Sequence, residues 1–122
     1  MCIRDRSKAT LRYNRQSPFK VRKVLNAVRG ANVGIAINYL HFSSEKASLA
    51  IEKTIRSAVA NLMQNDETND IDPDLIKIKE AYVNQGPVMK RFRAASMGRA
   101  SKLRRPTTVS YTHLTLPTKR IV

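Results

Sequence analysis

The chain has 122 residues, with 23 lysines and arginines against nine acids, and its formal charge is +14. A chain of this length builds one domain with a conventional core, and its charge indicates a polyanionic partner such as nucleic acid or anionic lipid rather than an ordinary cytosolic enzyme. The single cysteine, Cys2, excludes an internal disulfide or a cysteine-rich zinc site, and no apolar run reaches the roughly 20 residues that span a bilayer, so we expect a soluble protein of the reducing cytosol.

The first predicted elements are a strand and a helix with one basic side. Apolar and arginine residues alternate over residues 10–16, which favours a strand. Ser17 followed by Pro18 is typical of a helix start, and Gly30 is typical of a helix end. Between them the apolar residues recur at helical spacing, namely Val21, Val24, Leu25 and Val28. We expect this helix to bury one side and to leave its basic residues on the other.

Two more helices are predicted next. Residues 33–42 favour a short helix, although Gly34 lowers its propensity. Four of its residues can share a side: Ile35, Ala36, Tyr39 and Leu40. A long helix follows a cap at Ser43 or Ser44. Its apolar residues repeat at helical spacing: Ala47, Ala50, Ile51, Ile55, Ala58, Val59 and Leu62. We expect this helix to form the centre of the core.

A solvated connector and a second strand follow the long helix. Residues 66–74 hold five acids and a proline, so neither helix nor strand is favoured there. Residues 75–85 switch to a period of two, which indicates a strand. Its two sides are Ile76, Ile78 and Tyr82 against Lys77, Lys79 and Ala81. The order of elements predicts an α+β fold in which three helices pack against a small antiparallel sheet.

The segment of residues 86–105 carries seven lysines and arginines and no acid. Its few apolar residues are too scattered to build a core helix or a sheet face, and its like charges repel, so it should be mobile alone and ordered by a polyanion. Arginine suits bidentate contact to phosphate, and the small residues in the segment allow close approach of the backbone. A solvated loop is the alternative, but such loops usually mix both signs of charge.

Three stretches carry a resemblance to a known family: QSPFKVRKVLNAVRG, SAVANLMQN and YVNQGPVMKRFRAASMGRASKLRR. In this order and spacing they resemble the bacterial-type large ribosomal subunit protein twenty-two family over residues 12–108. The resemblance implies a structural constituent of the large ribosomal subunit whose globular domain binds rRNA and supports assembly. It also implies a long protruding β-hairpin at about 84–108 that lines the nascent-peptide exit tunnel.

The basic patterning and the resemblance together indicate roles for individual residues. Those expected to bind RNA are Arg12, Arg15, Lys20, Arg22, Lys23, Arg29, Lys90, Arg91, Arg93, Arg99, Lys102, Arg104 and Arg105. Those expected at the hairpin tip are Phe92, Ala94, Ala95, Ser96, Met97 and Gly98. The family usually has a basic residue at the position of Ala95 and often another at Met97, so this tip carries less charge than the family pattern. The implied partners are large-subunit rRNA, neighbouring large-subunit proteins and the nascent polypeptide, with no membrane, and the free protein is expected to be a cytoplasmic monomer.

The two ends, residues 1–7 and 109–122, depart from the family pattern and resemble translated sequencing-adapter DNA. We therefore expect a single domain over residues 8–122, and we expect that residues 1–7 and 109–122 are not native sequence. No evolved function is expected of Cys2 or His113. Residues 109–116 (VSYTHLTL) are nevertheless rich in β-formers, which favours a substitute strand by propensity alone.

Catalysis and cofactor chemistry find little support in the sequence. His41 and His113 are the only histidines, neither has metal-ligand spacing, and no Walker or dinucleotide glycine motif is present, so we expect no enzyme, cofactor or metal. Tyr39 and Tyr82 could stack on bases, but their places on amphipathic elements favour core packing. Two alternative functions remain: a general nucleic-acid-compacting protein, and a membrane-surface module, for which the basic segment lacks a wide apolar face.

Overall fold

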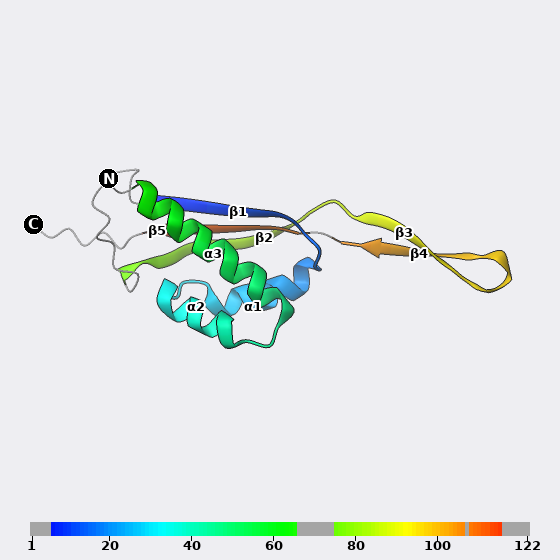
Figure 1. Cartoon of the computed structure of the whole chain (residues 1–122), viewed down its shortest axis with the longest axis horizontal. Helices are drawn as coiled ribbons and strands as arrows, with labels where there is room; N and C mark the ends of the chain where they lie inside the picture. Colours follow the sequence, from blue (N-terminus) through cyan, green and yellow to red (C-terminus); the bar gives the residue numbers. More distant parts are fainter. Residues whose placement is uncertain (1–5, 66–74, 107, 116–122) are drawn as a thin grey trace, which may run out of the picture.

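Two sheets divide the chain into a body and a projecting arm (Figure 1). The computed structural model describes residues 6–65, 75–106 and 108–115. The body contains an antiparallel sheet in the order β1-β5-β2, made of β1 (Arg6–Asn14), β2 (Lys77–Gln85) and β5 (Thr108–Thr115). Its helices are α1 (Pro18–Val28), α2 (Val33–Phe42) and α3 (Lys46–Asn65). The predicted α+β fold, a small antiparallel sheet with three helices, is confirmed.

The arm, residues 89–105, is an antiparallel hairpin of β3 (Met89–Ala94) and β4 (Ala100–Arg105). It extends away from the body as a thin ribbon, with no helix beside it (Figure 1). Residues 86–88 lead into it from β2, and Pro106 follows it. The basic segment predicted from the sequence therefore forms a projecting hairpin rather than a loop lying on the body.

The first helix begins and ends where the sequence predicts. Pro18 occupies the first turn of α1, where its missing N–H costs no hydrogen bond, and Ser17 precedes it. Gly30 follows the helix at a φ of +78°, a left-handed conformation that glycine adopts without a Cβ clash. All four predicted apolar residues are buried: Val21, Val24, Leu25 and Val28.

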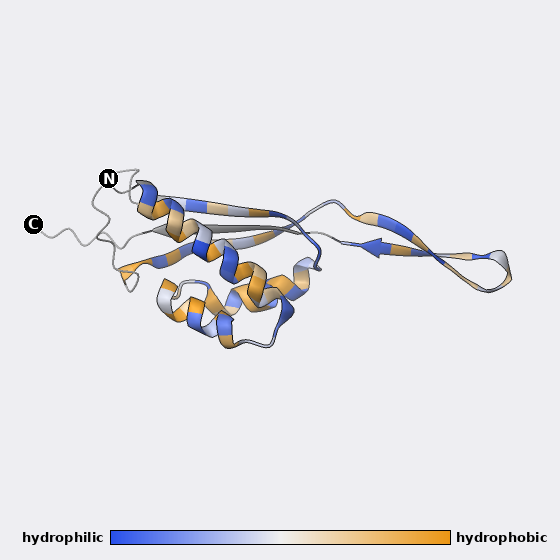
Figure 2. Ribbon diagram, viewed as in Figure 1, coloured by the Kyte–Doolittle hydropathy of each residue, from blue (hydrophilic) through white to orange (hydrophobic). Residues whose placement is uncertain are grey.

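The long helix α3 packs on β1 and β5 and supplies the centre of the core. In Figure 2, hydrophobic and hydrophilic residues alternate along it at helical spacing. Five of the seven predicted residues are buried, Ala47, Ile51, Ile55, Ala58 and Leu62, while the other two lie at the edge of the buried face. The prediction of a cap at Ser43 or Ser44 is wrong by one or two positions, because α3 begins at Lys46; the Ser43 hydroxyl accepts a hydrogen bond from the Glu45 N–H at 3.3 Å, ahead of the helix.

The side assignment in the short helix was partly wrong. Ala36 and Leu40 of α2 are buried, together with Val33, but Ile35 and Tyr39 are 63% and 53% exposed. Almost every residue of this helix is apolar, so its sequence defines no single stripe, and packing against α3 decides which side is covered. The prediction that Tyr39 packs in the core is therefore wrong.

A β-bulge overturns the side assignment in β2. The register against β5 shifts between Ile78 and Glu80, so two residues of β2 face one step of the partner strand. After the bulge the buried residues are Ala81 and Val83, whereas Tyr82 is 43% exposed. A strict period of two had placed Ala81 outside and Tyr82 inside, and the inserted residue reverses both positions.

The last strand, β5, lies between β1 and β2 and pairs with both. The β-forming residues near the C-terminus thus form a strand, as predicted. Pairing with β5 also extends the first strand toward the N-terminus, because β1 begins at Arg6 rather than near residue 10. The predicted acidic connector, residues 66–74, lies outside the described residues, as does Cys2.

Candidate nucleic-acid interface

The cations of the arm are exposed and have no acidic neighbour within the hairpin. All seven have exposed side chains: Lys90, Arg91, Arg93, Arg99, Lys102, Arg104 and Arg105. Within the described part of the chain, the acid that contacts a basic side chain is Glu52 in the body: it pairs with Arg56 at 2.6 Å, and His41 Nδ1 lies 3.7 Å from the same carboxylate. The positive charge of the arm is therefore available to an external anion.

The register of the hairpin distributes this charge over both faces. Directly opposite residues share a face, and successive residues alternate. One face carries the pairs Lys90–Arg104 and Phe92–Lys102, and the other carries Met89–Arg105, Arg91–Leu103 and Arg93–Ser101. Each face therefore holds three cations, and Lys90 lies opposite Arg104, a like-charge pair that destabilises an isolated hairpin. Such an arm suits surroundings that are anionic on all sides.

The residues predicted for the tip are divided between strand and turn. Phe92 and Ala94 lie within β3, so they belong to the paired strands of the arm rather than to its turn. The turn itself, a 3-10 segment at Ser96–Gly98, holds both Met97 and Gly98 at positive φ, 59° and 70°. Positive φ at two successive central residues is the pattern of a type I′ turn, whose twist matches that of the strands. The Met97 side chain is 95% exposed at the end of the arm.

Two of the predicted RNA-binding arginines, Arg22 on α1 and Arg29 at its C-cap, also bind the edge strand of the sheet. Arg22 donates from Nε and Nη2 to the Val83 carbonyl oxygen at 3.2 and 2.9 Å, and Arg29 donates from Nε to the Ala81 oxygen at 3.0 Å. Since β2 is an edge strand, these bonds satisfy carbonyl groups that would otherwise face water. The Arg22 guanidinium carbon also lies 5.8 Å from the centroid of the Phe19 ring.

On the other side of the bulge, the outer edge of β2 forms backbone hydrogen bonds with the chain around the start of α2. Val33 donates its N–H to the Ile76 oxygen at 3.0 Å, and Ile78 donates to the Ala31 oxygen at 3.1 Å. The arginines continue this line of contacts toward the arm. Of the predicted RNA-binding residues on α1 and at its C-cap, Lys20, Lys23 and Arg29 are exposed, but Arg22 and Arg29 each have at least one nitrogen committed to the sheet.

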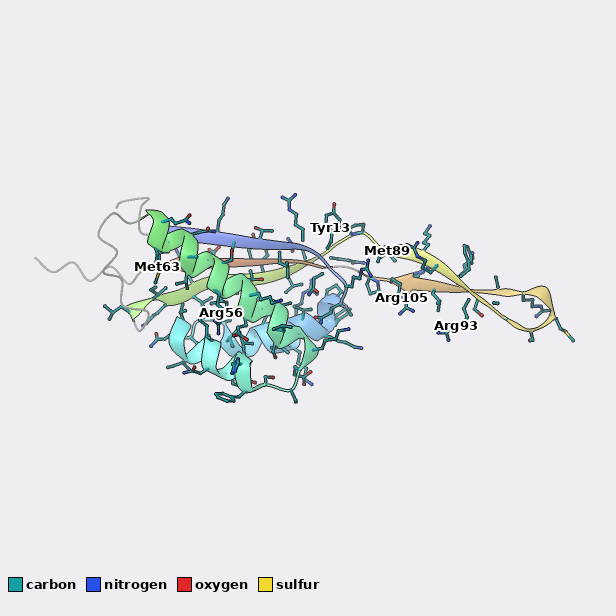
Figure 3. The ribbon with its side chains drawn as sticks, viewed as in Figure 1. Tyr13, Arg56, Met63, Met89, Arg93 and Arg105 are labelled. Carbon is teal, nitrogen blue, oxygen red and sulfur yellow. The ribbon has the colours of Figure 1, made fainter. Side chains whose placement is uncertain are left out.

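A basic cleft of about 920 Å³ lies where the arm meets the body. Its cationic lining residues are Arg15, Lys20, Lys23, Lys46, Arg91, Arg104 and Arg105. Among the described residues that line it, Glu45 is the one acid. Figure 3 shows Met89 and Arg105 at the root of the hairpin and Arg93 farther along the arm. Six of the seven cationic lining residues were predicted to bind RNA, and the seventh, Lys46, was not.

Lys46 carried a signal that the sequence analysis did not use. It is the first residue of α3, where the positive end of the helix dipole disfavours a cation. A lysine there is unfavourable for the helix alone, and an external anion would offset its repulsion. Arg12 lies outside this cleft, exposed on β1.

A second hollow, of about 720 Å³, lies over α2, and the described residues that line it are uncharged apart from Glu45. Ile35, Tyr39 and Phe42 line it, and all three are more than half exposed. His41 is exposed beside it, and its ring makes an edge contact with Phe42 at 5.3 Å between centroids. In the described segments, no three metal-ligating side chains gather at one place, and no helix combines the length and apolarity of a bilayer-crossing segment.

Comparison with known proteins gives consistent matches over most of the chain. The family model described as ribosomal protein L22p/L17e matches residues 9–115. A protein named large ribosomal subunit protein uL22 from Synechococcus sp. (strain JA-2-3B'a(2-13)) is 43% identical over 114 residues, which cover 93% of this chain and 86% of that protein. Proteins of the same name from Magnetococcus marinus and Desulfatibacillum aliphaticivorans are 41% and 45% identical over 83% and 82% of this chain, and 87% and 89% of their own lengths.

Proposed function

Because the chain belongs to the ribosomal protein L22p/L17e family, we propose that it is a structural constituent of the large ribosomal subunit that binds rRNA. It acts as a scaffold on the cytoplasmic ribosome and not as an enzyme. Its partners are the large-subunit rRNA and neighbouring large-subunit proteins. It contributes to translation by position and charge rather than by a chemical step.

The observation that carries this function is the arm with three cations on each face and no acid. A protein that lies on a flat anionic surface needs cations on one face only. A membrane-surface module would in addition present a wide apolar face to the lipid. Charge on both faces suits an arm enclosed by RNA phosphates, and it argues against the membrane alternative.

The finer role we propose is that the arm reaches into the nascent-peptide exit tunnel and forms part of its wall. Its tip carries no cation between Ala94 and Gly98, and Met97 there is 95% exposed. This arrangement suits an arm whose cationic strands, β3 and β4, contact phosphates and whose uncharged tip contacts the nascent polypeptide. We propose a monomer for the free protein.

Charge reversal in the arm tests this function. The triple variant Lys90→Glu, Arg91→Glu and Arg99→Glu replaces exposed cations of the arm, outside the core of the body. Its melting temperature should therefore differ from that of the unaltered protein only by the small amount typical of surface substitutions. Its incorporation into large subunits should fall strongly, measured by competition with the unaltered protein during reconstitution and by co-sedimentation at moderate salt.

A matched control separates the arm from the overall charge. Lys8→Glu, Lys53→Glu and Lys79→Glu make the same change in net charge at exposed body positions, and this variant should still enter the subunit. Incorporation of both variants at the level of the unaltered protein would contradict the proposal. Equal affinity of the unaltered protein for duplex DNA and structured rRNA would instead support a general nucleic-acid-compacting protein.

We also propose that residues 1–7 and 109–122 are not native sequence and that the native domain has a different last strand. Mass spectrometry of the protein from its source cells tests this. A peptide that runs from Thr108 into SYTHLTL would overturn the proposal.

A further inference from the structure

We propose that the basic cleft at the root of the arm binds a run of RNA phosphates and that this binding fixes the direction of the arm relative to the body. The proposal rests on the proposed function, because rRNA supplies the phosphates. It adds a site and a mechanical role: the cleft acts as a hinge that closes on a polyanion.

The walls of the cleft come from both sides of the hinge. Lys20 near the start of α1 and Lys46 at the start of α3 belong to the body, while Arg91 and Arg105 belong to the arm. A ligand seated between them therefore contacts both parts at once. Among the described elements, β3 and β4 contact chiefly each other, so burial against the body contributes little to holding the arm in place.

Electrostatics disfavours a closed cleft without a ligand. Cations line both walls, and in the described part of the chain Glu45 is the one acid that lines the cleft. Like charges on opposite walls repel, and this repulsion weakens with added salt. An anion in the cleft attracts the cations of both walls. The arm therefore becomes ordered in the orientation in which Arg91 and Arg105 contact the same ligand as Lys20 and Lys46.

The dimensions and charge of the cleft favour a chain of phosphates over a single ion. A volume of about 920 Å³ is much larger than one phosphate, and seven cations exceed the charge that one phosphate carries. The starts of α1 and α3 add the partial positive charge of two helix N-termini. Ser17, which makes no capping hydrogen bond with its side chain, also lines the cleft and offers a hydroxyl donor.

The test measures the spread of arm directions in the full chain. Two spin labels are placed at Met97→Cys on the tip and Ser57→Cys on the exposed side of α3, in a Cys2→Ser background, and their distance distribution is recorded by electron double resonance. The probes are inorganic tripolyphosphate and a short oligouridylate. Each should narrow the distribution by about twofold at low salt, as expected when a ligand selects one state of an ensemble.

The cleft variant Lys20→Glu, Lys46→Glu should abolish this narrowing, and its affinity for tripolyphosphate should fall by about tenfold for each lysine–phosphate interaction removed. The matched control Lys8→Glu, Lys53→Glu changes the net charge equally outside the cleft and should narrow like the unaltered chain. All four side chains are exposed, so both variants should fold, which circular dichroism would check.

Two results would overturn the proposal: an unchanged distribution in the presence of both probes, or equal narrowing in the cleft variant and its control. If either result is found for a protein that enters large subunits normally, the hinge proposal is refuted and the proposed function is unaffected. Narrowing by tripolyphosphate in a protein that fails to enter large subunits would instead support the cleft and contradict the proposed function.

Discussion

Replacing Arg22 with methionine should destabilise the body while leaving RNA affinity little changed. The substitution keeps the aliphatic part of the side chain and removes the guanidinium that donates to the Val83 carbonyl at 3.2 and 2.9 Å. That carbonyl lies on the outer edge of β2, which has β5 on its other side. Without Arg22 the edge has one fewer satisfied carbonyl and one fewer link to α1.

The size of the effect follows from the hydrogen bond and its surroundings. A hydrogen bond from a charged donor contributes about 1.5–3 kcal/mol to stability when it is well shielded from water. Arg22 is only half-buried, so solvent competes and we expect about 1–2 kcal/mol. For a small domain this loss lowers the melting temperature by roughly 4–10 °C.

The control for this prediction is Lys23→Met on the same helix. Lys23 is exposed and lines the basic cleft, so its loss should lower RNA affinity and leave the melting temperature within about 2 °C of the unaltered protein. Thermal unfolding by circular dichroism and filter binding of an rRNA fragment measure the two quantities. Equal melting temperatures for the two variants, or a larger loss of RNA affinity in Arg22→Met, would refute the division of roles between these neighbours.

Three further predictions concern the salt dependence, the core and the turn. Neutralising Lys90, Arg91 and Arg99 to glutamine should lower the slope of log affinity against log salt by roughly 2–3, from titrations at several salt concentrations, because each phosphate contact contributes about 0.7–0.9. Ile55→Ala should cost about 2–5 kcal/mol in urea unfolding, since Ile55 is 1% exposed at the centre of α3. Met97→Asn should slow hydrogen exchange of the Ala95 N–H, which donates to the Arg99 oxygen at 2.8 Å, several-fold relative to Met97→Ala, because asparagine tolerates the positive φ at the turn.

The sequence predicts those parts of the fold that local chemistry determines. The start of α1 at Pro18, its end before Gly30 and the buried side of α3 all follow from caps and from apolar residues at helical spacing. Each of these signals lies within one element. No knowledge of the neighbouring element is needed to read them.

The errors arise where a distant partner decides the outcome. The bulge in β2 exists only in its pairing with β5, about thirty residues farther along the chain, and it reverses the sides of Ala81 and Tyr82. In α2, which is apolar nearly all round, packing against α3 leaves Ile35 and Tyr39 outside. The candidate site shows the same limit, because Arg22 and Lys23 look equivalent in sequence until the edge of β2 is in place.

Stability and position are supplied by separate parts of this molecule. The body is held by an apolar core around α3, and the order of that core does not depend on the arm. The arm has cations on both faces, a like-charge pair in its own ladder and little contact with the body, so its direction is not determined by burial. What remains to determine it is the anion that lies along its faces and in the cleft at its root. A folded body can thus be complete in solution while the arm acquires a single direction only when RNA binds, which lets recognition and ordering occur in one step.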